Sequence, residues 1–184
     1  MAFLKFGSKL SSKFKHLAVI GVLALTACDE ASNVTPGFTR GEIVQSTLIY
    51  SNSKGPILVE IHGDPFGMRD SVLAEKILAS LVGHFTSPII RFTTDKDKAF
   101  TPNVTYRIAF GWPEKEGAEE LCSKKIPDLS PKLEKITVAG AFCMDSERLS
   151  DAEGWVTDVK TPDDLKFKSL MSDLARSVLD RGVE

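Results

Sequence analysis

Short runs of β-branched and aromatic residues alternate with polar turns along the chain, and two other segments repeat apolar residues at helical spacing. The runs predict strands at residues 43–50, 56–63, 89–94, 105–112 and 136–144. A polar stretch at 51–55 separates the first two runs and predicts a hairpin loop. The 136–144 run is apolar at successive positions, which is typical of a central strand.

The two helical segments follow the second and the last of these runs. Asp70 is the expected N-cap of the first helix, which places Leu73, Ile77 and Leu81 on one stripe. Thr161 and Pro162 are expected to start the second helix as N-cap and first helical residue. Its apolar stripe comprises Phe167, Leu170, Met171, Leu174 and Val178.

The resulting order, β-β-α-β-β-β-α, predicts the α+β class. We expect a single two-layer sandwich in which two helices cover one face of a mainly antiparallel sheet of about five strands. Residues 43–184 would form this domain, and 157 residues from Cys28 onward are enough for one core.

A stripe of large side chains marks the 105–112 run. Strand alternation places Tyr106, Ile108, Phe110 and Trp112 on one face. Two amphipathic helices need an apolar surface to cover, so this stripe is predicted to be core. The alternative is a ligand pocket on an uncovered face of the sheet.

The N-terminal segment is basic and then apolar. Four lysines precede an apolar run at 17–25 that is too short to span a bilayer. The next residues, Leu25-Thr26-Ala27-Cys28, resemble the lipobox of bacterial lipoproteins. The resemblance implies a signal peptide at 1–27, cleavage before Cys28, and acylation of Cys28 that tethers the protein to a lipid bilayer. A transmembrane helix and an ordinary cleaved signal are the alternatives.

The residues after Cys28 indicate which membrane would hold the lipidated protein. Asp29 and Glu30 resemble the acidic signal that retains bacterial lipoproteins in the inner membrane, so the resemblance implies the periplasmic side of that membrane. Residues 28–42 lack periodicity and contain Pro and Gly, which predicts a lipidated N-terminus followed by a linker.

The net charge of the chain without its N-terminal segment disfavours one class of ligand. Loss of residues 1–27 removes four lysines and no acid, which takes the formal charge from −2 to −6 and disfavours nucleic-acid binding.

With Cys28 acylated, Cys122 and Cys143 remain as an even pair in an oxidising compartment, and this predicts a disulfide. The alternative makes one of them a nucleophile beside His62 or His84.

Candidate chemistry is confined to the end of the 56–63 run. Glu60 and His62 share a strand face and Asp64 follows, so the three side chains could bind a divalent metal or act as an acid and a base. The alternative is a solvated strand face that runs into a turn. No recognised metal-ligand spacing or catalytic motif is present, so no cofactor or metal is expected. The following turn, Phe66-Gly67-Met68, is either a partner contact or a loop anchored in the core.

These observations favour a non-enzymatic accessory or assembly factor that binds a membrane-proximal envelope protein. The strand, Phe-Gly turn, helix and strand are loosely similar to small domains of other envelope lipoproteins, such as activators of cell-wall synthases. That similarity concerns the fold alone. The alternative is a small-molecule-binding or metal-dependent hydrolytic domain that uses Glu60, His62 and Asp64.

Overall fold

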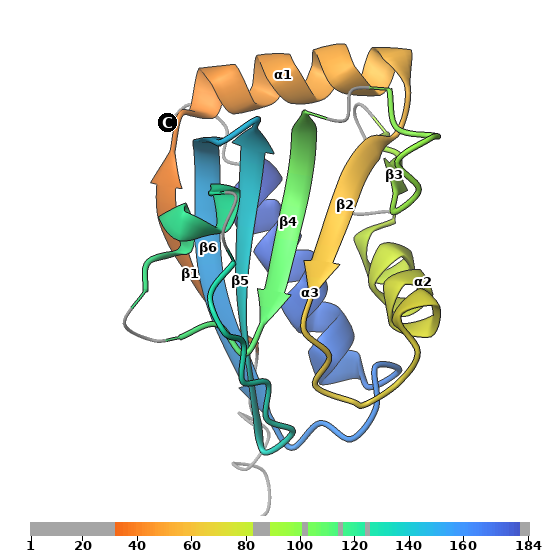
Figure 1. Cartoon of the computed structure of the whole chain (residues 1–184), viewed down its shortest axis with the longest axis vertical. Coiled ribbons are helices and arrows are strands. Elements are labelled where there is room, and N and C mark those ends of the chain that lie inside the picture. Colours follow the sequence, from red (N-terminus) through yellow and green to blue (C-terminus); the bar gives the residue numbers. More distant parts are fainter. Residues whose placement is uncertain (1–31, 83–88, 101–102, 114–115, 124–125, 181–184) are drawn as a thin grey trace, which may run out of the picture.

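A computed structural model describes residues 32–82, 89–100, 103–113, 116–123 and 126–180. The fold is α+β, with one six-stranded mixed sheet and three α-helices in the order β-α-β-α-β-β-β-β-α (Figure 1). Within the described ranges, none of the helices has the length and apolar character needed to cross a bilayer.

The sheet has the strand order β1-β6-β5-β4-β2-β3. Its strands are β1 (Asn33–Thr39), β2 (Ile57–His62), β3 (Phe92–Thr93), β4 (Val104–Phe110), β5 (Lys135–Met144) and β6 (Glu147–Thr157). The helices are α1 (Gly41–Lys54), α2 (Asp70–Leu81) and α3 (Leu165–Leu179), and a 3-10 helix, η1, covers Ala118–Cys122. Strands β1, β6, β5 and β4 pair antiparallel, whereas β2 runs parallel to β4 and β3. Strand β2 therefore runs antiparallel to β1 and finishes at the same end of the sheet at which β1 starts, although β6, β5 and β4 lie between them.

The main core lies between the sheet and the three helices. Alternation along β4 points Tyr106, Ile108 and Phe110 towards the helices, and all three are fully buried. Helix α3 covers them, and the ring of Phe167 stacks on Phe110 with 5.9 Å between centroids. The stripe is thus core from Tyr106 to Phe110, as predicted, and α3 covers the face of β4 on which a ligand pocket was the alternative.

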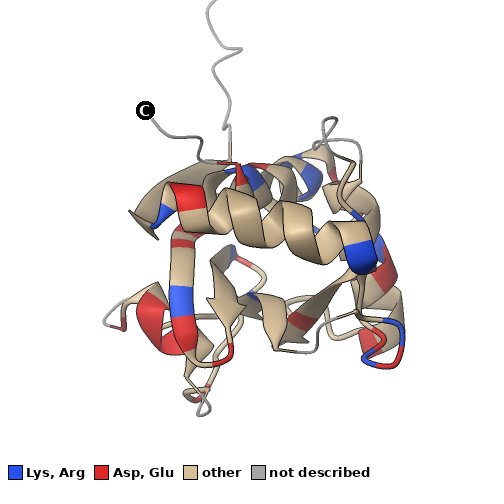
Figure 2. Cartoon of the chain, turned by 90° about the horizontal axis from the view of Figure 1, so that it is seen from above, with Lys and Arg blue, Asp and Glu red and all other residues tan. Residues whose placement is uncertain are grey.

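A second, smaller core covers the opposite face of the sheet. Ala139, Ala141 and Cys143 of β5 pack there against Leu121 and Cys122 of η1. Figure 2 shows α1 and η1 on opposite sides of the sheet. Small side chains on β5 let η1 lie close to the strands, so both faces of the central sheet are buried.

Trp112 departs from the predicted stripe. Gly111 has a φ of +72°, and this left-handed residue interrupts the alternation after Phe110. A side chain at Gly111 would approach the backbone nitrogen of Pro131 to 2.2 Å. Trp112 consequently packs in the smaller core, where its Nε1 donates a hydrogen bond to the carbonyl of Glu116 at 2.7 Å.

The predicted strand at 43–50 is wrong, because this segment belongs to helix α1. Its β-branched residues suggested a strand, but the buried positions are Val44, Leu48, Ser51 and Asn52, which recur at helical spacing. Asn52 ties the last turns of the helix to the segment before β3, since its side chain donates to the carbonyl of Ile89 and accepts from the backbone of Arg91. Tertiary contacts outweigh the local preference, and no hairpin forms at 51–55.

The predicted linker is also wrong over residues 33–42. This segment forms strand β1 and the start of α1, and β1 pairs antiparallel with β6. Pro36 and Gly37 suggested an irregular segment, but they lie at an edge strand with a register shift, where proline is tolerated. Strand β6 was not predicted, and the mainly antiparallel five-stranded sheet is in fact a mixed six-stranded one.

The other predicted elements exist with different boundaries. Helix α2 begins at Asp70 with Arg69 as its N-cap. Helix α3 begins at Leu165, where Asp164 acts as N-cap by accepting a hydrogen bond from the backbone of Lys166 at 2.9 Å. The predicted 89–94 strand is reduced to the two residues of β3.

Candidate functional site: a cleft along the open edge of β2

A cleft in the described part of the chain lies along β2. It has a volume of about 740 Å³ and is lined by all seven consecutive residues from Leu58 to Asp64. Residues from both faces of the strand take part because β3 pairs only with Ile57 and Leu58. Beyond that point the edge of β2 has no neighbouring strand on this side among the described residues. The cleft therefore follows an open sheet edge.

Three other segments complete its walls. Helix α2 contributes Asp70, Ser71, Leu73 and Ala74, and the chain after β3 contributes Thr94 and Lys96. Ile126 and Leu129, from the segment after η1, close the opposite side. The α2 wall combines apolar Leu73 and Ala74 with exposed Asp70 and Ser71, and Lys96 adds a charged group from the chain after β3.

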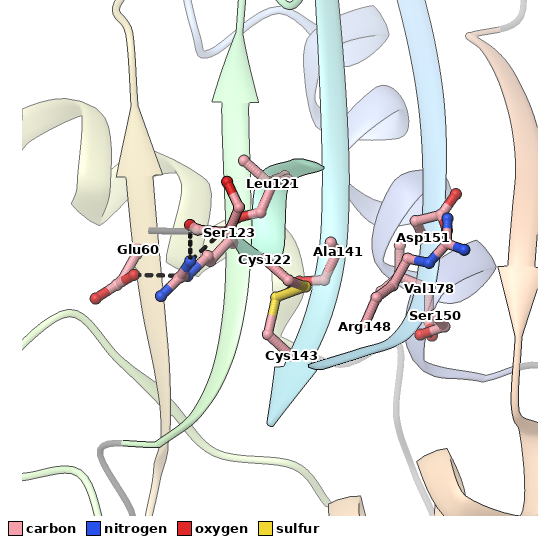
Figure 3. Close-up of a disulfide and its surroundings, with 11 residues drawn as sticks. Glu60, Leu121, Cys122, Ser123, Ala141, Cys143, Arg148, Ser150, Asp151 and Val178 are labelled. Atoms are coloured by element: carbon pink, nitrogen blue, oxygen red, sulfur yellow. Dashed lines mark hydrogen bonds and ion pairs between the residues drawn. A yellow bond between two sulfur atoms is a disulfide. The ribbon is translucent and has the colours of Figure 1, made fainter. Parts of the chain in front are cut away.

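Glu60, which lines this cleft, forms an ion pair with Arg107 of β4. Arg107 Nε is 2.9 Å from Glu60 Oε2, and both side chains are only about one-fifth exposed, at 18% and 20%. Arg107 Nη1 also donates to the carbonyls of Leu121 and Ser123 at 3.1 and 3.0 Å (Figure 3). Arg107 thus joins β2, β4 and the η1 segment.

Lys96, which also lines the cleft, forms a second and longer ion pair with Glu60. Its Nζ lies 3.5 Å from Glu60 Oε1, and its side chain is 71% exposed. Glu60 is therefore shared by two cations, and Arg107 is the closer and more buried of the two. A carboxylate held in this way has a structural role and is poorly suited to act as a general base.

His62 lies at the end of β2 on the same strand face as Glu60. Burial lowers the pKa of its imidazole, the cations of Arg107 and Lys96 lower it further, and Glu60 opposes them. Its Nε2 is buried and has no hydrogen-bond partner in the described structure. His62 is accordingly neutral near pH 7.

Asp64 forms the turn that follows β2. Its carboxylate accepts hydrogen bonds from the backbone of Phe66, at 2.7 Å, and of Met68. Gly63 and Gly67 supply the positive φ values of 76° and 64° that this turn needs. The ring of Phe66 packs edge-on against Phe167 with 5.0 Å between centroids, so the Phe66-Gly67-Met68 turn is anchored in the core.

The three candidate side chains line one cleft, but each has a structural partner or a buried position. The described ranges contain no group of three or more His, Cys, Asp or Glu side chains placed to hold a metal ion. The geometry therefore gives no support to a metal site or an acid/base pair at Glu60, His62 and Asp64. Sequence analysis missed Lys96 and Ser71, because only the fold brings their loop and helix to β2.

The disulfide predicted from the cysteine count is present. It joins Cys122 of η1 to Cys143 of β5 across 21 positions of sequence (Figure 3). Neither cysteine is thus a free thiol, which removes the nucleophile interpretation; His84, its other proposed partner, lies outside the described residues. The disulfide and Arg107 fix the η1 segment against the sheet.

No protein-family model matches the chain, and no curated protein matches it. Two solved structures of the PelC dodecamer from Paraburkholderia phytofirmans are similar in structure. One, of a single-substitution variant, has a TM-score of 0.40 and 11% identity and covers 80% of this chain and 98% of that one. The other has a TM-score of 0.34 and 12% identity and covers 81% and 97%. Similarity at this level does not indicate a shared function.

Proposed function

We propose that the chain is the precursor of a lipid-anchored periplasmic protein whose domain binds an envelope protein close to the membrane. The lipobox resemblance at Leu25-Thr26-Ala27-Cys28 and the acidic residue Asp29 support anchoring to the inner membrane on its periplasmic side. The Cys122–Cys143 disulfide is consistent with an oxidising compartment.

The observation that carries the proposal is the position at which the fold begins. Ser32 donates a hydrogen bond to Asp173 of α3 at 2.6 Å, and Asn33 pairs with Trp155 of β6. Only three residues separate Cys28 from Ser32. An extended chain rises about 3.5 Å per residue, so Ser32 would lie within about 14 Å of an acylated Cys28.

This short tether gives the domain a defined orientation. The end of the sheet where β1 begins would face the membrane, and α1 would cross the opposite end (Figure 1). Strand β2 finishes at the same end of the sheet at which β1 starts, so the part of the cleft beside Ile61 and His62 would open near the membrane. A partner that reaches this cleft is therefore itself close to the membrane.

Intact-protein mass spectrometry of the full chain purified from membranes tests the anchor. We expect a chain that starts at Cys28 and carries the mass of a diacylglyceryl group, usually with a further acyl chain. A Cys28→Ala form should retain residues 1–27 and carry no lipid. An unmodified chain that starts elsewhere would contradict the proposal.

In-cell crosslinking tests the partner. The full-length protein and the Cys28→Ala form would be crosslinked in cells and purified by affinity. A discrete envelope protein recovered with the anchored form alone supports the accessory role. Equal recovery with both forms would show that anchoring does not matter for the contact.

A further inference from the structure

We infer that the open edge of β2 is a docking site for an extended segment of the partner protein, which pairs with β2 as an additional strand. The inference rests on the proposed function in one respect, namely that the protein has a membrane-proximal protein partner. It specifies the surface, the mode of binding and the side chains that the segment would carry.

Backbone geometry supports pairing at this edge. The backbone nitrogen of Ile57 donates to the carbonyl of Arg91 at 2.8 Å, so the peptide groups of Ile57 point away from β4. Strand residues two and four positions apart point the same way, which directs the N–H and C=O of Ile61 to the same side. Strand β3 ends at Thr93 and pairs no further than Leu58, so it does not reach Ile61.

The chain leaves the edge after β3 instead of covering it. Asp95 donates its backbone N–H to Thr93 Oγ1 at 3.1 Å, and a turn at Asp95 then follows. The cleft of about 740 Å³ lies along β2 beyond the end of β3 and is lined by Thr94 and Lys96, which follow β3 in the chain. An exposed strand edge of this kind is a template for pairing with another chain.

The two sides of the cleft define the side chains of the incoming segment. On the helix side, Leu73 and Ala74 of α2 are apolar, and the exposed Asp70 and Ser71 at the start of the helix also line the cleft. On the other side Lys96 projects over Glu60, 3.5 Å from it. Successive residues of an added strand would face these two sides in turn, which favours a segment that alternates apolar and acidic residues.

Lys96 is available for such a contact because Glu60 does not depend on it. Arg107 holds Glu60 at 2.9 Å in a largely buried pair, whereas the Lys96 side chain is 71% exposed. Lys96 can therefore bind a second carboxylate without leaving Glu60 unpaired. Charge complementarity thus favours an acidic residue over a basic one at that position of the segment.

Hydrogen exchange of the full chain, purified from membranes in mild detergent, tests the inference. The probe is a short synthetic peptide in which valine and glutamate alternate, and the controls are a valine–lysine peptide and a backbone N-methylated valine–glutamate peptide. We expect the valine–glutamate peptide to slow exchange in the segment around Ile61. The N-methylated peptide should protect it far less, because it cannot complete the ladder.

Two charge variants sharpen the test. Lys96→Glu should weaken binding of the valine–glutamate peptide by about three- to tenfold and improve binding of the valine–lysine peptide. Lys98→Glu is the matched control, because Lys98 is 74% exposed, pairs with Asp95 on the same loop and does not line the cleft. It should leave both affinities unchanged.

Three results would overturn the inference. One is the absence of protection around Ile61 with any peptide, and another is equal protection by the N-methylated peptide. The third is protection without added peptide in a chain of dimeric mass, which would assign the edge to a second copy. None of these results bears on Cys28, so the intact mass distinguishes failure of the docking site from failure of the anchor.

Discussion

Removal of the Cys122–Cys143 disulfide is the perturbation whose effect follows most directly from the structure. The cross-link spans 21 positions, and loop-closure entropy for a loop of that length is worth about 3 kcal/mol of unfolding free energy. For a domain of this size that corresponds to a fall in melting temperature of about 6–12 °C. The double variant Cys122→Ala, Cys143→Ala should show this loss.

The native structure should survive the change, because other contacts hold the same segment. Arg107 donates to the carbonyls of Leu121 and Ser123, and Leu121 is fully buried. The loss of stability therefore arises mainly in the unfolded chain, which becomes less restricted. The urea dependence of unfolding should steepen, since a chain without the cross-link exposes more surface.

Urea unfolding of three samples checks this reasoning: the oxidised protein, the reduced protein and the double alanine variant. The reduced protein keeps both sulfur atoms in place, so it separates the cross-link from the packing of buried side chains. We expect the reduced protein and the variant to lose similar amounts of stability. Reduced protein as stable as oxidised protein would refute the account.

Three further predictions concern the core, the first strand and the response to acid. Phe110→Ala should lower the unfolding free energy by about 3–5 kcal/mol in urea titrations, because Phe110 is fully buried and stacks on Phe167; a loss below about 1 kcal/mol would contradict its place in the core. Gly37→Ala should loosen β1 and speed hydrogen exchange at 33–39, because its Cβ would lie 1.8 Å from Asp151 Oδ1; unchanged exchange would exclude this contact. The folded-state pKa of His62 lies below its usual 6.5, so its protonation favours unfolding, and stability present above pH 6.5 should be lost as pH falls towards the folded pKa. His62→Gln should remove that part of the pH dependence in parallel urea titrations, and an identical profile in both proteins would contradict the burial of His62.

Sequence pattern was sufficient for the elements whose apolar residues follow a regular pattern along the sequence. Strand β4 alternates cleanly, β5 is apolar at successive positions, and the stripe of α3 recurs at helical spacing. The disulfide could likewise be predicted from the even number of cysteines that remain after acylation and from the oxidising compartment. These features depend on local order in the sequence, so they can be predicted without knowledge of the fold.

Strand β1 and helix α1 could not be predicted in the same way. Helix α1 is rich in β-branched residues, and Asn52, which ties it to the segment before β3, gives no periodic signal. Strand β1 contains Pro36 and Gly37, and it becomes a strand only because β6 lies beside it. Long-range pairing decides both cases, and a local pattern carries no information about it.

In the candidate site, too, some features follow from the local sequence pattern and others depend on the fold. Alternation correctly places Glu60 and His62 on one strand face, and the turn residues at Asp64 serve the backbone. The open edge of β2 could not be anticipated, because it depends on the shortness of β3. Lys96 reaches the cleft through that same loop.

Site-specific photocrosslinking in cells is the measurement that tests the central claim most directly. A photoreactive residue would replace Ser71, which is exposed and lines the cleft, or Ser46, which is exposed on α1 and lies outside it. We predict that Ser71 yields a discrete adduct with one envelope protein, that Ser46 does not, and that Cys28→Ala abolishes the adduct. The absence of any adduct from Ser71, or an adduct that persists unchanged in the Cys28→Ala form, would contradict the claim.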